Sequence, residues 1–437
     1  MLSKEDNDLI TQTGPGTPCG ELMRRYWHPV ALAREIPLGG APKPVRLLGE
    51  DLVLFRTKRG EPGLMDLHCP HRGTDLSYGR VEDDGLRCLY HGWKMGLDGH
   101  CLDQPGEPKG SNFKNKVRHV AYPCREAGGL IMTYMGPGEA PPLPKLPIFE
   151  AAASHVWSSK LFHECNYLQG TEGEVDSQHL SYLHRMASPD KAPDQVQQET
   201  DFLLAVDESP DIDFEPTQYG LRLFATRLLG DGRKYVRITN FIMPYTGAFD
   251  GAPLFDPRRV GKKDNLGYWM HWHVPIDDTH HWKYIVAHCH DTPLEPEFLH
   301  RIIETDVTPE FDHVRNKSNR YLQNREEMDR LTFLGMGYNF EVHDRFATES
   351  QHPISDRTRE HLGAADRGVT AMRRLMLQAI KDVQAGRAPV MTTADPAANS
   401  LEGMVVVSET VPVATDNRAI WRDFLAQRMG RNSVAAK

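Results

Sequence analysis

The amino-acid sequence predicts an α+β protein, in which a small all-β domain precedes a larger domain of antiparallel sheet flanked by helices. Between Val45 and about Met135, short alternating segments are separated by tight turns, which is typical of an all-β domain. A proline-rich run follows, and beyond it strand pairs are mixed with segments of helical apolar periodicity. The change of pattern at the prolines predicts a domain boundary there.

The first part of the chain divides into an N-terminal segment, residues 1–44, expected to pack on the larger domain, and the all-β domain, residues 45–136. Alternating residues predict three strands, and turn residues predict two hairpins. The strands are Val45–Leu48, Leu52–Arg56 and Gly63–His68, and the turns are Lys58–Glu61 and Asp98-Gly99.

Residues 137–150 are expected to form a proline-rich linker, and residues 151–437 the larger domain. Two strand pairs are predicted there, the first joined by a glycine-containing turn. They are Leu221–Leu229 with Tyr235–Met243, and Trp269–Val274 with Trp282–His288. Helical patterns cover residues 160–190 and 309–330, and an apolar stripe from Val369 to Val383 predicts a helix that ends near Gly386 and Pro389.

The composition is that of an ordinary globular protein, with 437 residues, 39% hydrophobic and 25% charged. The formal net charge is −9 and no long basic run is present, so we expect no nucleic-acid partner. No stretch approaches the roughly 20 apolar residues that a membrane helix needs. The chain starts with a polar segment without an apolar signal core, and we therefore expect a cytoplasmic protein.

The seven cysteines are read as metal ligands or buried apolar residues, because an odd number in a chain without an export signal argues against disulfides. Five of them have no partner at a ligand spacing and are expected in the core. These are Cys19, Cys101, Cys124, Cys165 and Cys289.

Two short Cys–His pairs form the first candidate metal site: Cys69 with His71, and Cys88 with His91. Zinc is one alternative, since two cysteines and two histidines suit tetrahedral zinc. However, zinc fingers usually pair Cys with Cys and His with His. One cysteine and one histidine in each loop suit a dinuclear cluster, in which one iron takes both thiolates and the other both imidazoles. The glycines that follow, Gly73 and Gly92, would let backbone amides approach the sulfides.

These two loops resemble the Rieske motif of ring-hydroxylating oxygenase α subunits. The resemblance rests on Cys69-Pro70-His71-Arg72-Gly73 and Cys88-Leu89-Tyr90-His91-Gly92-Trp93. It implies a [2Fe–2S] cluster held by Cys69, His71, Cys88 and His91. Imidazole ligation places the potential of such a cluster at roughly −150 to +300 mV, so that it can accept electrons from a flavin or a plant-type ferredoxin.

A second candidate site lies in the segment that contains Asp176, His179 and His184. On a regular helix, histidines five positions apart would point about 140° away from each other. Both can face one metal only if the helix is distorted or ends between them. The Asp-x₂-His-x₄-His pattern is similar to that of the Rieske oxygenases, and it implies that His179 and His184 bind a mononuclear iron. By the same resemblance, Asp176 is the carboxylate that bridges to a cluster histidine of the neighbouring subunit.

The third iron ligand should be a distant carboxylate, because an iron that activates O₂ needs two histidines and one carboxylate on one side. The candidates are Asp344, Glu341, Glu349 and Asp356. The segment Asn339–Ser350 resembles the family segment in which Gln-Asp precedes Glu-Ser, and this favours Asp344. The chain departs from that pattern at His343, which stands in place of Gln and leaves open whether this histidine takes part.

Further segments are similar to the phthalate dioxygenase branch, so the resemblance covers nearly the whole chain. They are Glu5-Asp6-Asn7, Gly14–Pro18, Asp356–Thr358, Glu360–Gly363 and Arg373-Arg374. The fold that this implies for the larger domain is of the helix-grip type. The implied assembly is a homotrimer or a dimer of trimers, served by a separate NADH-dependent reductase of the flavin or ferredoxin type.

The implied activity is that of a terminal oxygenase that uses O₂ to hydroxylate an aromatic acid, by ring cis-dihydroxylation of a phthalate-like substrate. O-demethylation of a methoxylated aromatic acid, of the vanillate or dehydrodivanillate type, is the alternative. A non-catalytic Rieske electron carrier would need only the first site. A dehydrogenase with its own nicotinamide is not indicated, since no Gly-x-Gly-x-x-Gly lies between a strand and a helix.

Arginines on the first predicted hairpin of the larger domain are candidates for binding a substrate carboxylate, because a guanidinium can hold it through two parallel hydrogen bonds. We single out Arg222 and Arg237, with Arg227 on the same hairpin. The alternative for each is an ordinary surface or ion-paired arginine.

Overall fold

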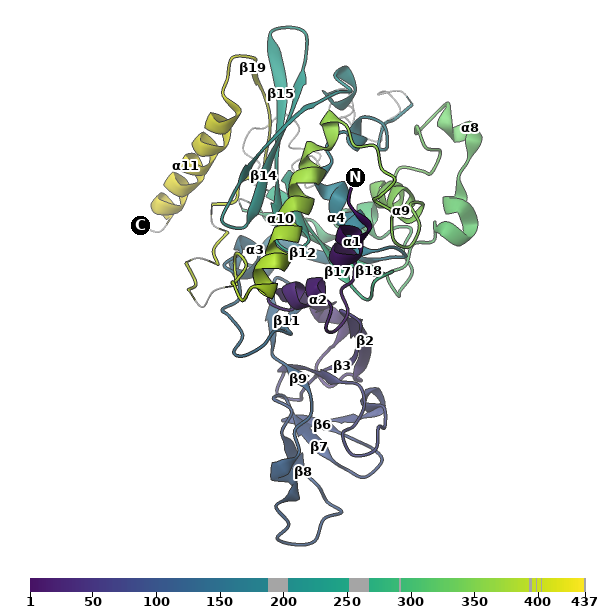
Figure 1. Cartoon of the computed structure of the whole chain (residues 1–437), viewed down its shortest axis with the longest axis vertical. Coiled ribbons are helices and arrows are strands. Elements are labelled where there is room, and N and C mark those ends of the chain that lie inside the picture. The colour runs from purple at the N-terminus through teal and green to yellow at the C-terminus, as the bar shows by residue number, and fades with distance from the viewer. Residues whose placement is uncertain are drawn as a thin grey trace.

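The chain folds into a broad part built on one large sheet and a narrow part built on small sheets, as Figure 1 shows. The computed structural model describes residues 1–187, 203–250, 267–290, 292–392, 395–397, 399–401 and 403–435. All seven cysteines lie within these ranges, and all are free and buried. None of the described helices is long and apolar enough to cross a membrane.

The narrow part contains two four-stranded antiparallel sheets. The first is formed by β2 (Lys43–Leu47), β3 (Glu50–Arg56), β4 (Pro62–Asp66) and β9 (Ala121–Tyr122). The second is formed by β5 (Arg80–Val81), β6 (Gly85–Arg87), β7 (Lys94–Gly96) and β8 (Cys101–Asp103). The three predicted strands and both predicted turns are confirmed here, and the turn glycines Gly60 and Gly99 adopt positive φ angles.

A three-stranded sheet lies between the narrow part and the large sheet. It has the order β1 (Trp27–Leu32), β11 (Leu130–Tyr134) and β10 (Cys124–Ala127). The N-terminal segment therefore supplies a strand that pairs with the end of the segment assigned to the all-β domain. It also supplies α1 (Lys4–Thr11) and α2 (Pro18–Met23), which pack on α10 (Arg367–Gln384). The boundaries of the predicted domains themselves stay a prediction.

The large sheet has eight strands, and all its pairings are antiparallel. Its order is β12 (Val156–His163), β18 (His281–Cys289), β17 (Gly267–Pro275), β16 (Thr246–Asp250), β15 (Arg233–Ile242), β14 (Gly220–Leu228) and β13 (Asp211–Pro216), with β19 (Val407–Pro412) beside β15. Both strand pairs predicted in this region are confirmed, as β14–β15 and β17–β18.

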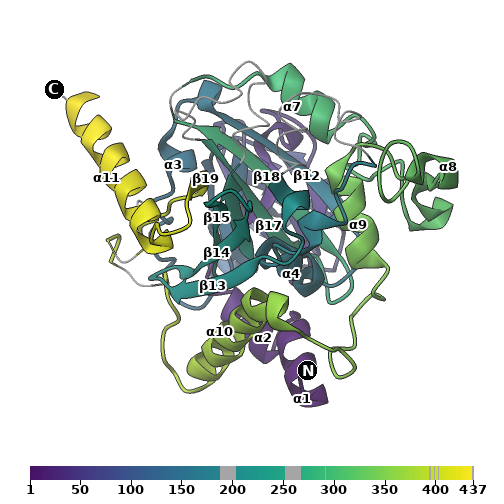
Figure 2. The ribbon, with the colours of Figure 1, turned by 90° about the horizontal axis from the view of Figure 1, so that it is seen from above.

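Alternation along the strands gives the large sheet two distinct faces. We call the face that carries Leu223, Arg227, His273 and Lys283 the inner face; α4 (Tyr167–Val175) and α10 (Arg367–Gln384) pack on it. The opposite, outer face carries Phe224, Val236 and Ile238 under α11 (Asn417–Ala435). Figure 2 shows α10 and α11 on different sides of the sheet.

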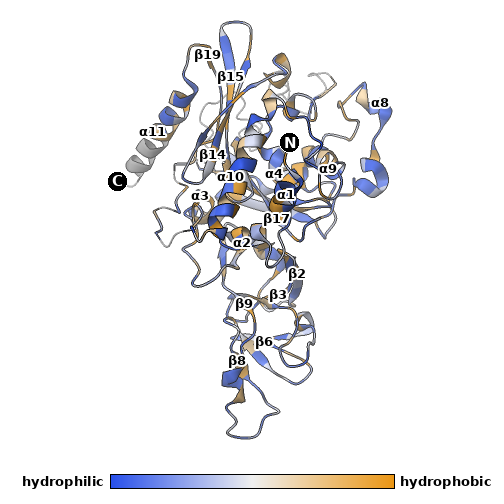
Figure 3. Ribbon diagram, viewed as in Figure 1, coloured by the Kyte–Doolittle hydropathy of each residue, from blue (hydrophilic) through white to orange (hydrophobic). Residues whose placement is uncertain are grey.

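The remaining helices are short. They are α3 (Pro147–Glu150), which packs on β10, α7 (Pro296–Ile303), which packs on β12, α8 (Arg325–Met328), and α9 (Phe340–Glu349), which packs on α4. The helix predicted from the apolar stripe is confirmed as α10, which carries both hydrophilic and hydrophobic residues in Figure 3 and is followed by Gly386 at φ +76°.

Two helical predictions are wrong in extent. The described residues 160–187 begin in the edge strand β12, and regular α-helix among them is limited to Tyr167–Val175. Residues 188–190 of this prediction lie outside the described residues. Charged residues 309–330 form turns, a 3₁₀ segment at Lys317–Leu322 and only one turn of α-helix, α8. Charge without a continuous apolar stripe does not specify a packed helix, because burial of such a stripe supplies most of the stability of a helix.

Candidate metal centres

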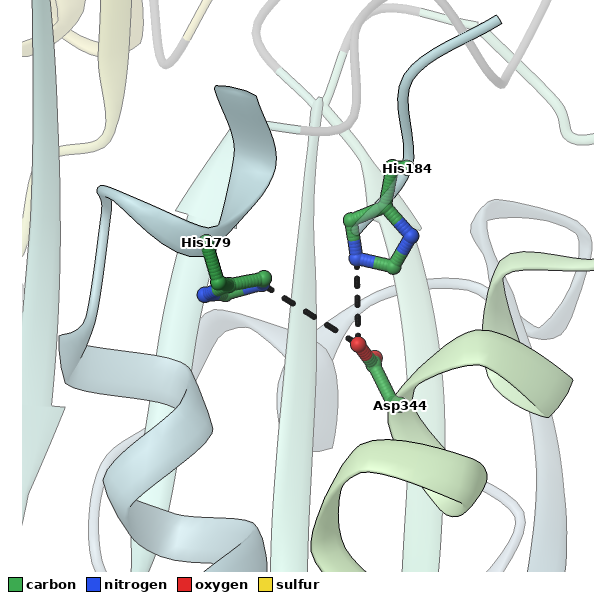
Figure 4. Close-up of side chains that lie close together, drawn as sticks. All are labelled: His179, His184 and Asp344. Carbon is green, nitrogen blue, oxygen red and sulfur yellow. Dashed lines mark ion pairs between the residues drawn. The ribbon is translucent and has the colours of Figure 1, made fainter. Parts of the chain in front are cut away.

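Two histidines and one carboxylate converge beside the inner face, as Figure 4 shows. His184 Nε2 lies 3.0 Å and His179 Nε2 4.0 Å from the same oxygen, Oδ1 of Asp344. One potential ligand atom from each side chain falls within 4.8 Å of the others. This donor set is the one that iron(II) oxygenases use, with three ligands on one side and open positions on the other.

The local chain conformation explains how the two histidines can face one point. Helix α4 ends at Val175, and Asp176 is its C-cap. His179 then begins a 3₁₀ turn, His179–Ser181, and His184 follows in irregular chain. The helix thus ends before the first histidine rather than between the two, so neither histidine lies on a regular helix.

Of the four carboxylates proposed for the third ligand, only Asp344 reaches the histidines. Glu341 is paired with Lys283 at 2.7 Å, and Glu349 with Arg345 at 2.7 Å. Asp356 is exposed, and its side chain accepts hydrogen bonds from the backbone amide and the hydroxyl of Thr358 in a turn. Burial alone would raise the pKa of Asp344, but the neighbouring His184 ring and the ammonium of Lys283 hold this pKa well below its ordinary value.

Lys283 connects this cluster to a buried polar network on the inner face. Its ammonium lies 2.7 Å from Glu341, 3.4 Å from Oδ2 of Asp344 and 3.9 Å from Glu174. Glu174 in turn accepts hydrogen bonds from His271 at 2.8 Å and His273 at 3.0 Å. Burial alone would lower the pKa of Lys283, but the surrounding carboxylates raise it above its ordinary value, so the ammonium is charged.

Asp176 has two separate partners. Its Oδ1 accepts hydrogen bonds from the backbone amides of Gln178 at 2.8 Å and His179 at 3.4 Å, which stabilises the turn after α4. Its Oδ2 lies 3.7 Å from Nδ1 of His179, the ring nitrogen that faces away from Asp344. The side chain is 27% exposed. The capping role and a position behind a metal-ligand histidine are thus both present.

The two Cys–His loops of the narrow part have the same backbone pattern. In the first, the amide of Gly73 donates to the carbonyl of Cys69, and the amide of Cys69 donates to that of Thr74. In the second loop, the amide of Gly92 donates to the carbonyl of Cys88, and the amide of Cys88 donates to the carbonyl of Trp93. Both glycines have positive φ, +72° and +75°, a conformation that other residues rarely adopt.

The side chains of these loops are sorted by type. Both cysteines are buried. Burial and the neighbouring Cys88 raise the pKa of the Cys69 thiol to about 11, while hydrogen bonds from the backbone amides of His71 and Arg72 act in the opposite direction. The His71 and His91 rings lie on the accessible side, with their centroids 4.5 Å apart, and His71 stacks on Trp93 at 4.4 Å. Two adjacent thiols behind two adjacent imidazoles fit a dinuclear cluster with mixed ligation.

Family models match both parts of the chain. One described as the Rieske [2Fe-2S] domain matches residues 26–121, and one described as LigXa C-terminal domain like matches residues 133–435. The chain belongs to the Rieske non-haem iron oxygenases. Members of this family carry a [2Fe–2S] cluster and a mononuclear iron, and the two donor sets described above fit these groups.

Several curated relatives of this Rieske oxygenase match along most of their length. It is 38% identical to the phthalate 4,5-dioxygenase oxygenase subunit of Pseudomonas putida over 90% of this chain and 89% of that protein. It is 34% identical to the 5,5'-dehydrodivanillate O-demethylase oxygenase subunit of Sphingobium sp. over 100% of this chain and 91% of that protein. It is also 34% identical to a tert-butanol monooxygenase / tert-amyl alcohol desaturase oxygenase subunit of Aquincola tertiaricarbonis, over 87% and 77%.

Solved structures share the fold. The terminal oxygenase of carbazole 1,9a-dioxygenase from Novosphingobium sp. KA1 matches with a TM-score of 0.55 and 22% identity, over 85% of this chain and 97% of that one. A carbazole-bound oxygenase in complex with its ferredoxin matches with a TM-score of 0.57 and 20% identity, over 86% of this chain and 94% of that one. These matches confirm the predicted fold class of the Rieske oxygenase.

The three hairpin arginines lie on different faces of the large sheet. Arg222 forms an ion pair with Glu215 and stacks on Trp421 of α11, 3.7 Å from the ring centroid. It belongs to the outer face, away from the metal cluster, because alternate residues of a strand point to opposite sides. We therefore do not retain Arg222 as a substrate residue.

Arg227 and Arg237 belong to the inner face. Arg227 is fully buried and donates to the carbonyl of Ser177 at 2.8 Å and to Ser181 Oγ at 3.2 Å, on either side of His179. Its Nε and Nη1 have no partner among the described residues. Arg237 lies opposite Ala225 on the neighbouring strand, is half-buried and forms no ion pair within the described part of the chain. Burial and Arg237 lower the pKa of Arg227 to about 10.

Sequence reasoning missed Lys283 and Glu174 and left His343 open. Lys283 offered a signal, since it is a charged residue at an inward position of a predicted strand, where burial without partners is costly. Glu174 lies only two residues before Asp176 and was hidden among other carboxylates of the motif.

Proposed function

We propose that this Rieske oxygenase hydroxylates an aromatic acid, by ring cis-dihydroxylation of a phthalate-like substrate. The observation that carries the proposal is the position of the His179, His184 and Asp344 cluster above an inner face with two arginines that lack a carboxylate partner among the described residues. A buried or half-buried cation is stabilised by an anionic partner, and a carboxylate of the substrate is such a partner.

In this proposal, His179, His184 and Asp344 hold the mononuclear iron, which supplies the chemistry that activates O₂. Lys283 holds the second oxygen of Asp344, so that Oδ1 is the atom presented to the metal. The carboxylate of Asp176 lies 3.7 Å from Nδ1 of His179, on the side of the ring away from the metal, and is proposed to orient that ring. O₂ and the substrate would approach the metal from the side that faces away from these three side chains.

Cys69 and Cys88 bind one iron of the [2Fe–2S] cluster and His71 and His91 the other. The accessible imidazoles are the side from which electrons enter and leave. In Figure 1, β6 and β7 beside these loops lie in the narrow part, whereas α4 and α9 of the mononuclear site lie in the broad part. This separation within one chain favours transfer to the mononuclear iron of a neighbouring subunit, with Asp176 as the bridge, in a homotrimer or dimer of trimers.

The guanidinium groups of Arg227 and Arg237 are proposed to bind the carboxylates of the substrate through charge-assisted hydrogen bonds. Arg227 also donates to the chain around His179, so a carboxylate held there lies close to the metal. The ring of the substrate then faces the open side of the cluster.

O-demethylation of a methoxylated aromatic acid is the alternative, favoured by the match to the dehydrodivanillate O-demethylase subunit along this whole chain. Both reactions consume O₂, two electrons and two protons. Dihydroxylation places both oxygen atoms on the ring, whereas demethylation yields a phenol, formaldehyde and water. A bare electron carrier would need none of the second donor set.

Electrons are proposed to come from NADH through a separate reductase or ferredoxin. Structures of related oxygenases in complex with a ferredoxin support such a partner.

Incubation of the purified protein with a compatible reductase, NADH and a panel of phthalates and methoxybenzoates tests the proposal. A cis-dihydrodiol from a phthalate supports dihydroxylation, and formaldehyde from a methoxybenzoate supports the alternative. Oxidation of neither class, in a preparation with full iron content, would contradict the aromatic-acid assignment.

A further inference from the structure

His343 lies directly behind one of the metal-ligand histidines. It is fully buried on α9, one residue before Asp344. Its Nδ1 lies 3.3 Å from Nδ1 of His184, and the two rings are nearly parallel, 21° apart, with centroids at 5.5 Å. Its other nitrogen, Nε2, lies 2.8 Å from the carbonyl oxygen of Gly337. Both ring nitrogens of His343 therefore have one partner each.

These two contacts determine where the protons lie. A carbonyl oxygen can only accept a hydrogen bond, so Nε2 of His343 carries a proton and donates it to Gly337. A buried imidazole is favoured in its neutral form, which has only one N–H. Nδ1 of His343 is then an acceptor, and the contact with His184 requires that Nδ1 of His184 be the donor.

The same assignment leaves a lone pair on Nε2 of His184. This is the atom that lies 3.0 Å from Oδ1 of Asp344 and converges with His179 on the proposed metal position. A carbonyl oxygen remote from the metal thus sets the tautomer of a ligand through one intervening ring.

We propose that His343 is a positioning residue for the metal centre: it accepts the Nδ1 proton of His184 and so fixes the ring orientation and tautomer in which His184 Nε2 binds the metal. This inference rests on the proposed iron site.

The arrangement makes the two histidine ligands unequal. Metal-ligand histidines usually donate their second N–H to a carboxylate, a carbonyl or water, and a carboxylate raises the basicity of the ligand. The carboxylate behind His179 is Asp176, whose Oδ2 lies 3.7 Å from Nδ1 of His179, beyond direct hydrogen-bond distance in this structure. His184 has a neutral imidazole instead. We therefore infer that His343 orients its ligand without adding charge to it.

Substitution of His343 by two residues separates hydrogen bonding from packing. His343→Leu removes both hydrogen bonds. His343→Gln keeps an amide oxygen that can accept from His184 and an amide nitrogen that can donate to Gly337. Phe340→Leu is the matched control, because Phe340 also packs on His184, with ring centroids 4.9 Å apart, but through its ring alone.

The readout is the dissociation constant of the mononuclear iron, measured by competition with a chelator on holoprotein whose cluster EPR signal is intact. His343→Leu should weaken iron binding about 10- to 100-fold, as removal of an outer partner of a ligand typically does. His343→Gln should keep most of the affinity, and Phe340→Leu should change it less than His343→Leu. An unchanged affinity in His343→Leu, or equal losses in the Leu and Gln variants, would overturn the proposal.

Solid-state ¹⁵N NMR of histidine-labelled wild-type protein loaded with Zn²⁺ at the mononuclear site does not depend on the folding of a variant. The resonances are assigned by comparison with His184→Ala and His343→Gln. The inference requires His184 protonated at Nδ1 and His343 protonated at Nε2, and a proton on Nδ1 of His343 would overturn it. If instead His184→Ala keeps all its iron, the proposed iron site itself is wrong, an outcome distinct from failure of the His343 inference.

Discussion

The ammonium of Lys283 lies 3.4 Å from Oδ2 of Asp344, while Oδ1 of the same carboxylate faces His179 and His184. The two oxygens of Asp344 thus have different partners. A carboxylate whose one oxygen is held by a buried cation presents the other to a metal in a fixed direction. Glu341 and Glu174 hold the lysine in turn, so that the position of the proposed ligand depends on a network anchored in strand β18.

Replacement of Lys283 by methionine should destabilise the protein by about 3–5 kcal/mol, because the buried carboxylate of Glu341 loses its cation. The free energy of unfolding in urea measures this loss. The double variant Lys283→Met with Glu341→Gln should recover part of it, since the uncompensated charge is then removed. Lys4→Met, in an exposed pair with Asp8, is the control without a measurable effect. Equal losses in the single and double variants would show that the charge pairing is not the cause.

Asp176→Asn should uncouple the two metal centres. Asparagine can still accept from the amide of Gln178, so the turn after α4 should persist. It places an uncharged group behind Nδ1 of His179 and cannot accept from two imidazoles as a carboxylate can. Metal contents should stay near normal, and reduction of the cluster from outside should survive. Stopped-flow mixing of the reduced variant with oxygenated substrate should show slow reoxidation of the cluster and little product. Reoxidation of the cluster at the wild-type rate, with product formed, would contradict the bridging role of Asp176 and leave it only as the cap of α4.

Arg237→Gln should raise KM for an aromatic acid by about tenfold or more, because charge-assisted hydrogen bonds to the substrate are lost, with a smaller effect on kcat. Steady-state kinetics measure this effect. Arg233→Gln on the same strand is the matched control, since Arg233 is exposed and paired with Asp231 at 2.5 Å. Its KM should be unchanged. Similar KM values for all three proteins would remove Arg237 from the substrate site.

The active enzyme is expected to be a trimer or a dimer of trimers, because the two metal centres lie in different parts of one chain. Sedimentation velocity at the assay concentration tests this expectation. A monomer that turns over substrate would contradict transfer between subunits and, with it, the bridging role of Asp176.

The sequence predicts local features well where one short segment determines them. The two Cys–His loops, the hairpin of β14 and β15 and the amphipathic helix α10 all follow from spacing and periodicity within a few residues. The contact of Asp344 with the histidines joins distant segments, and only the resemblance to a family pointed to it. The face on which an arginine lies depends on strand register, which places Arg227 inside and Arg222 outside although both occupy one strand.

The buried partners of the metal centre were the hardest to predict. Lys283, Glu174 and His343 carry no motif of their own. Their roles arise because β18, α4 and α9 pack together and bring one side chain from each beside the metal ligands. Such contacts depend on tertiary packing, which local patterns do not encode.

The ratio of iron to acid-labile sulfide in the wild type and in Asp344→Ala tests most directly whether this chain holds a mononuclear iron beside a [2Fe–2S] cluster. The wild type should contain about 1.5 iron atoms per sulfide, and Asp344→Ala about one, with the EPR signal of the reduced Rieske cluster retained and product formation lost. Asp356→Ala, at a carboxylate whose hydrogen bonds are with Thr358 in an exposed turn, should keep the higher ratio. If Asp344→Ala keeps both the higher ratio and turnover, the iron is held elsewhere and the proposed catalytic centre is wrong.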